Sequence, residues 1–126
     1  MAEKERYERR AARFGQSGKA VVLTRVAQTL ASNGAVAIDA SAGNSHAVTL
    51  QANATSTTIS NASTGQELVI TYIQDSTGGR TYVWPTNCKF AAATAPSDTT
   101  LSTRTSVTFI YDGTNWNETA RAVAVA

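Results

Sequence analysis

From about residue 20 onward, apolar and polar side chains alternate in short runs that turn residues separate. A period of two is typical of strands that bury one face. The clearest run is QELVITYIQ at residues 66–74, whose two faces carry Leu68, Ile70 and Tyr72 on one side and Val69, Thr71 and Ile73 on the other. Because both faces are fairly apolar, we expect this strand in the centre of the fold or against a neighbouring subunit.

The same pattern predicts strands on both sides of that central run. Tight turns are expected at Gly78–Gly79, with Arg80 starting the return strand of a hairpin, and at Asp112–Gly113. The residues between 87 and 103 are weakly patterned and predict a long loop anchored by Phe90. We therefore predict an all-β domain, an antiparallel β-sandwich or barrel, without an internal repeat beyond the two hairpins. The expected strands are 19–30, 35–40, 46–51, 54–61, 66–74, 80–85, the hairpin 105–120, and 121–126.

Residues 1–19 differ from the rest and predict a short helical or extended arm. Glu, Lys, Arg and Ala dominate until Gly15, and these residues favour a helix. The arm carries a formal charge of +3, whereas residues 20–126 sit at −1. An isolated helix of this length is marginal in water, so we expect the arm to dock on another surface. A helix packed on its own domain is the alternative. The candidate contact residues are Tyr7, Arg9, Arg10, Arg13 and Phe14.

Composition limits the remaining choices. The 126 residues fit one β-domain, 20–126, behind the arm, and only 16% are charged. No apolar run is long enough for a membrane helix, and the charged N-terminus lacks the apolar core of a signal peptide. We therefore expect assembly in a cytoplasm and no membrane partner. Three Glu residues among the arginines argue against nucleic acid as a partner.

Candidate chemistry is sparse. The STGGR turn at 76–80 lacks the spacing of a phosphate loop, and no helix pattern follows it. His46 and Cys88 are single residues of their type and cannot form a zinc site alone, so we expect no metal, no cofactor and no enzymatic activity. Trp84 and Trp116 are candidates for core packing, a subunit interface or a sugar-stacking surface. Gly78, Gly79 and Arg80 are turn candidates beside them.

The order of motifs along residues 46–117 resembles a β-module that recurs in tail fibres and related virion proteins of tailed phages. A strand runs into Gln-Asp, a Gly-Gly-Arg turn and Trp-Pro; a Thr-Ala-Pro loop and a strand ending in Tyr-Asp-Gly-Thr-Asn-Trp follow. The stretch at 87–94 departs from that pattern. The matching residues are Gln74, Asp75, Gly78, Gly79, Arg80, Thr81, Trp84, Pro85, Thr94, Ala95, Pro96 and 111–116.

The resemblance implies a virion structural protein that assembles symmetrically, as a homotrimer, without catalysis. Because a single module stands behind an arm, we expect a capsid decoration protein that binds the major capsid protein on the outer head surface and stabilises the shell. The alternative is a tail or head fibre component that binds a host surface glycan or receptor, with few copies per particle and an exposed aromatic patch near Trp84 or Trp116.

Overall fold

The computed structural model describes residues 24–126, and those residues form an almost entirely β domain. The prediction of an all-β fold is thereby confirmed, and the predicted arm lies outside the described residues. The strands are β1 (Arg25–Leu30), β2 (Gly34–Asp39), β3 (Ser45–Leu50), β4 (Ala54–Ser60), β5 (Glu67–Gln74), β6 (Cys88–Lys89), β7 (Arg104–Tyr111) and β8 (Trp116–Val125); a short 3₁₀ turn, η1, covers Ala91–Ala93.

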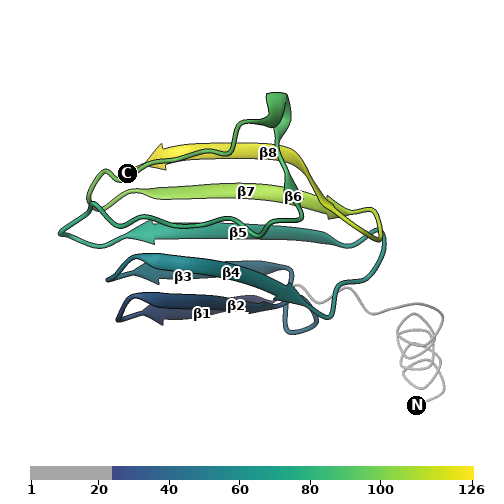
Figure 1. Cartoon of the computed structure of the whole chain (residues 1–126), viewed down its shortest axis with the longest axis horizontal. Coiled ribbons are helices and arrows are strands. Elements are labelled where there is room, and N and C mark those ends of the chain that lie inside the picture. The colour runs from purple at the N-terminus through teal and green to yellow at the C-terminus, as the bar shows by residue number, and fades with distance from the viewer. Residues whose placement is uncertain (1–23) are drawn as a thin grey trace, which may run out of the picture.

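The first half of the domain is a stack of parallel strands in two layers (Figure 1). The chain passes from β1 in the six-stranded sheet to β2 in the two-stranded sheet, back to β3, and again to β4. Arg25 pairs with Ser45 and Gly34 with Ala54, a spacing of 20 residues in each sheet. The backbone pairing therefore repeats at 20 residues in this half, a spacing that the sequence analysis did not predict.

The second half is antiparallel, and its β7–β8 hairpin is the one that Asp112 and Gly113 predicted. β5 follows β3 in parallel and then pairs antiparallel with β7, which turns into β8. The turn after β7 uses Gly113 at φ +100°, a left-handed backbone that glycine adopts without cost. The complete order is β1-β3-β5-β7-β8-β6 beside β2-β4, so the sheets are mixed and the prediction of antiparallel pairing holds only for β5, β7 and β8.

The core lies between the two layers. It takes one face of each strand, with Val36 from β2, Leu50 from β3, Ile70 from β5 and Val107 from β7 all at most 1% exposed. The predicted alternation of β5 is confirmed: the Leu68 face is buried and the Val69 face is half-buried. Burial of apolar surface from both layers makes the stack and the hairpin one cooperative unit.

Candidate functional site

The segment 74–81, which carries the resemblance, is a turn that side chains hold rigidly. The carboxylate of Asp75 accepts hydrogen bonds from the backbone of Thr77 and Gly78, and it pairs with the Arg80 guanidinium at 3.1 Å. The Gln74 side chain donates to the Arg80 carbonyl at 2.7 Å and accepts from the Arg80 amide at 3.0 Å. The hydrogen bond from Arg80 holds the pKa of the Asp75 carboxyl below its usual value.

Both glycines of the turn have positive φ, and one also needs space. Gly78 has φ +69°, and a Cβ placed there would lie 2.8 Å from the backbone of Leu101. Gly79 has φ +72° and open space around the Cβ position, so only its backbone conformation favours glycine. The turn thus lets the chain cross between the layers while it packs on the 98–102 loop. It is not the predicted hairpin, because the returning Thr81 pairs with Ala54 of β4 instead of β5.

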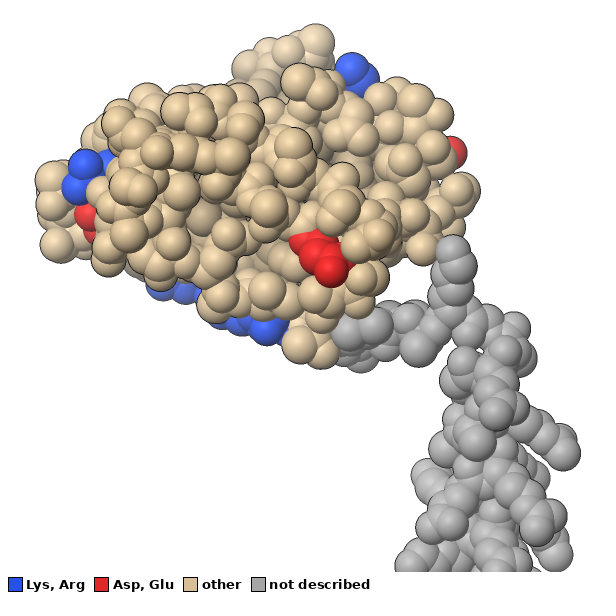
Figure 2. Space-filling view, turned by 60° about the horizontal axis from the view of Figure 1, so that its bottom comes forward, with Lys and Arg blue, Asp and Glu red and all other residues tan. Residues whose placement is uncertain are grey.

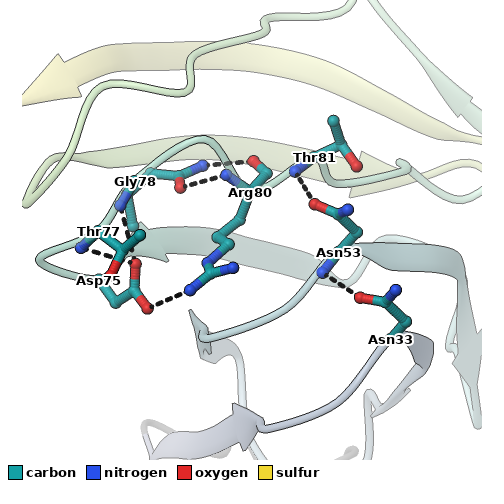
Figure 3. A network of polar contacts seen from close by, with 8 residues as sticks. Asn33, Asn53, Asp75, Thr77, Gly78, Arg80 and Thr81 are labelled. Atoms are coloured by element: carbon teal, nitrogen blue, oxygen red, sulfur yellow. Dashed lines mark hydrogen bonds and ion pairs between the residues drawn. The ribbon is translucent and has the colours of Figure 1, made fainter.

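An asparagine ladder joins this turn to the stack (Figure 3). The Asn33 side chain accepts a hydrogen bond from the Asn53 amide at 3.0 Å, and the Asn53 side chain accepts one from the Thr81 amide at 2.9 Å. Asn33 and Asn53 are 20 residues apart and occupy equivalent corners of successive turns. The ladder adds to the backbone bonds from Gly34 to Asn53 and from Ala54 to Thr81, and so satisfies two more amides where the chain bends from one sheet to the other.

Trp84 lies in an aromatic cluster inside the domain. It is 9% exposed, its ring meets Tyr72 and Phe90 edge-on, and its indole N–H donates to the Pro96 carbonyl at 3.0 Å. Phe90 anchors the long loop, as predicted, and also contacts Phe109. The edge-on ring contacts and the buried aromatic surface of this cluster therefore hold the loop against the sheet.

The other singled-out side chains are buried too. Trp116 is fully buried and stacks at a tilt on Tyr111. Both tryptophans thus pack in the core, which is one of the three roles predicted for them, and neither forms the exposed aromatic patch expected of the fibre alternative. His46 is 1% exposed, with its Nε2 2.9 Å from the Gly43 carbonyl oxygen. Burial raises the pKa of the Cys88 thiol to about 12, which keeps it protonated and unreactive at neutral pH.

An exposed knob at Ala91–Ala95 projects beside β8 at the far end of the stack from β1 (Figure 1). Ala92 and Ala93 have φ +54° and +55°, a backbone that costs roughly 1–2 kcal/mol for each non-glycine residue. A clamp from β8 holds it. Glu118 accepts from the Ala91 amide at 3.0 Å, while Arg121 binds Glu118 at 2.7 Å and donates to the Thr94 carbonyl at 2.9 Å.

Charged groups are isolated over the described part of the chain, and Figure 2 shows the one face in view as mostly uncharged. Two ion pairs, Asp75–Arg80 and Glu118–Arg121, occur within residues 24–126. No group of three metal-ligating side chains forms in that range. No helix found there is long and apolar enough to cross a bilayer.

The contact candidates in the arm are outside the region that the structure describes. Tyr7, Arg9, Arg10, Arg13 and Phe14 all precede Thr24, so their capsid-contact role stays a prediction. Of the candidates inside the domain, Arg80 joins Gly78 in one turn, while Trp84 and Trp116 support the core. The Ala91–Ala95 knob escaped prediction, because a run of alanines gives no signal for a left-handed backbone.

The turn framework and the two-layered sheets define a rigid all-β structural domain. A family model described as "Putative phage tail fibre C-terminal domain" matches residues 30–116. Since this match spans more than half of the chain, the protein belongs to that family and is a phage virion structural protein. The resemblance seen in the sequence is confirmed at this level. No curated protein and no solved structure matches the chain.

Proposed function

We propose that this chain is a fibre-type component of the virion and that its β-domain contacts the host surface. The family match over residues 30–116 carries the proposal, because it covers every strand from β2 to β7. A tail-fibre location is therefore preferred over the outer capsid surface. Capsid decoration is the alternative, and the charged arm, residues 1–19, is the feature that favours it.

The Ala91–Ala95 knob is the proposed host contact. It lies at the opposite end of the stack from β1, where the described chain begins, so it would face outward if the N-terminal side joins the particle (Figure 1). Its five residues are exposed, and the left-handed Ala92 and Ala93 are held by the Glu118–Arg121 clamp. Backbone strain that surrounding contacts maintain is typical of binding loops.

The domain acts by binding, with no catalytic step, metal or cofactor. The described carboxylates mostly serve turns: Asp39, Asp75 and Asp112 each accept bonds from nearby backbone amides. The pKa of each carboxyl is lowered, chiefly by the side-chain hydrogen bond from Ser41 for Asp39, by that from Arg80 for Asp75, and by the backbone bond from Asn115 for Asp112. Groups used in this way support loops and are poor general acids near neutral pH.

Binding of fluorescently labelled full-length protein to host cells tests this function. We expect saturable binding that unlabelled protein competes away and that Ala95→Arg weakens at least about tenfold, because a bulky charge would stand in the contact. Thr58→Arg is the matched control on exposed β4 and should bind normally. Prior removal of surface glycans distinguishes a glycan from a protein receptor. Absence of saturable binding would contradict the proposal.

A further inference from the structure

The six-stranded sheet has a second face that points away from the core, here called the outer face. On β5 it carries Val69, Thr71 and Ile73, all half-buried, and on β7 it carries Ser106 and Ile110. None of these apolar side chains belongs to the core or packs against it, and Ile110 is 41% exposed. The middle of the outer face thus carries apolar side chains and hydroxyl groups. Contact with water does little to stabilise such a surface.

A row of small side chains crosses the outer face. The strand registers place these residues side by side on five strands, and the Thr71 and Ser106 hydroxyls share a hydrogen bond of 2.7 Å within the row. Small side chains let a second sheet approach closely without a clash. The row consists of Ala27, Ala47, Thr71, Ser106 and Ala122.

Opposite charges stand at the two ends of this face. Glu67 pairs across the strands with Ile110, and Arg104 pairs with Ile73 six positions further along, which places the two charges about 20 Å apart. Both are exposed, and neither makes an ion pair within residues 24–126. That distance is well beyond a Debye length of about 8 Å, so the attraction between these two charges within one chain is screened.

We propose that the outer face is the surface through which copies of this chain associate, with Glu67 of one copy beside Arg104 of the next. A second copy fits because one surface supplies both the apolar strip and the two complementary charges. When the outer faces turn toward an axis along the stacking direction, the acidic end of each β5–β7 pair meets the basic end of its neighbour. Cyclic symmetry of this kind closes without leaving an open face.

The direction of the axis agrees with the fibre role and rests on that proposed function. With the axis along the stack, every copy has β1 at one end and the Ala91–Ala95 knob at the other (Figure 1). All β1 ends would then face the particle together, and all knobs would face the host. Several weak knob contacts would act at once and raise the overall affinity. A homotrimer, which the resemblance implies, satisfies this geometry.

The first test measures the mass of the purified full chain by light scattering after size exclusion. We expect a closed oligomer for the native protein. Ser106→Arg should raise its dissociation constant by at least about 30-fold, because it buries an unpaired charge in the contact. Thr58→Arg, an arginine on the exposed face of the other layer, should leave the mass unchanged. Circular dichroism checks that both variants stay folded.

The second test swaps the charges. Glu67→Arg and Arg104→Glu alone should each weaken association about tenfold, since each places like charges together. The double variant Glu67→Arg/Arg104→Glu should restore the native dissociation constant. Because the two positions lie about 20 Å apart within one chain, such rescue can arise only between copies.

Either of two results would overturn the proposal: a native monomer at micromolar concentration, or an oligomer that Ser106→Arg leaves intact. Failure of the double variant to rescue would refute the pairing of Glu67 with Arg104. These outcomes are separate from host binding, because the mass is measured without cells. A protein that assembles through the outer face but binds no host cell would refute only the proposed function.

Discussion

The domain has a stacked half, β1 to β4, and a hairpin half, β5, β7 and β8. The two halves pair their strands in different ways. In the hairpin half β7 turns directly into β8 through a tight turn with local signals, such as Asp112 and Gly113, while β5 reaches its partner β7 through the long segment 75–103. In the stacked half each strand pairs with one 20 residues away, and side chains such as Asn53 close the corners. The comparison teaches that local turn chemistry identifies hairpins, whereas a parallel stack is specified by a repeat.

The largest expected effect is a lower free energy of unfolding when a core side chain is removed from either half. Trp116→Ala in the hairpin half and Leu50→Ala in the stacked half each remove a fully buried side chain. We expect losses of about 3–5 kcal/mol for the first and about 2–5 kcal/mol for the second. Urea unfolding followed by circular dichroism and by tryptophan fluorescence measures both. Because the halves share one core, the two probes should give one transition; separate midpoints would show that the halves unfold independently.

The turn at 74–81, where the chain crosses from β5 toward β4, is tested at Gly78 and Gly79. Gly78→Ala should cost roughly 2–3 kcal/mol, because the methyl group meets the Leu101 backbone in addition to the strain of positive φ. Gly79→Ala is the matched control with similar φ and open space, and it should cost only about 1 kcal/mol. Thermal or urea unfolding gives the difference. Equal losses would mean that Leu101 moves aside and that this contact does not fix the crossing.

The asparagine ladder sharpens the account of the stacked half. Asn53→Ala leaves the Thr81 amide without its acceptor and should lower the free energy of unfolding by about 1–2 kcal/mol. Asn53→Asp keeps an acceptor oxygen at the same place and should retain most of the stability. Hydrogen exchange of the Thr81 amide should quicken in the alanine variant alone. An unchanged exchange rate would mean that the Asn53 side chain does not protect the Thr81 amide.

The smallest expected effect is the response of both halves to acid. Hydrogen bonds from Ser41 and Asn61 lower the pKa of Asp39 in the stacked half, and bonds from Asn115 and Asn117 lower that of Asp112 in the hairpin half. Each folded-state pKa lies below the unfolded one, so this stability is complete above about pH 4 and is lost as the pH falls through the folded values.

Urea unfolding between pH 2.5 and 7 measures that loss. Both carboxylates are exposed, so each contribution should be small. Asp112→Asn should flatten the acid slope slightly and leave the neutral-pH stability nearly unchanged, because the amide oxygen still accepts bonds. A slope that Asp112→Asn steepens would contradict the assignment.

Sequence patterns were most informative where burial or turn chemistry is local. The alternation in 67–74 predicted a central strand and its two faces, without deciding which face is buried, and Asp112 and Gly113 predicted the hairpin turn. The parallel partners were missed, although Thr29-Leu30 and Thr49-Leu50, with Asn33 and Asn53, repeat at 20 residues. Small polar strands make that repeat weak, and pairing partners depend on the packing of the whole stack.

Functional side chains were harder to predict for a related reason. The sequence left core packing, a subunit interface and a sugar-stacking surface open for the two tryptophans. The core role of Trp84 depends on the loop between 86 and 103, where Phe90 meets its ring and Pro96 accepts its N–H. The knob depends on Glu118 and Arg121, which follow it by more than twenty positions. Such contacts between distant segments arise only after the sheet has formed.

The copy number of this chain in purified phage particles tests the central claim most directly. Quantitative mass spectrometry against the major capsid protein would give it. The fibre account predicts a small number of copies per particle, in a fixed ratio to other tail or fibre proteins. A number comparable to that of the capsid protein would contradict it and would favour capsid decoration through residues 1–19 instead.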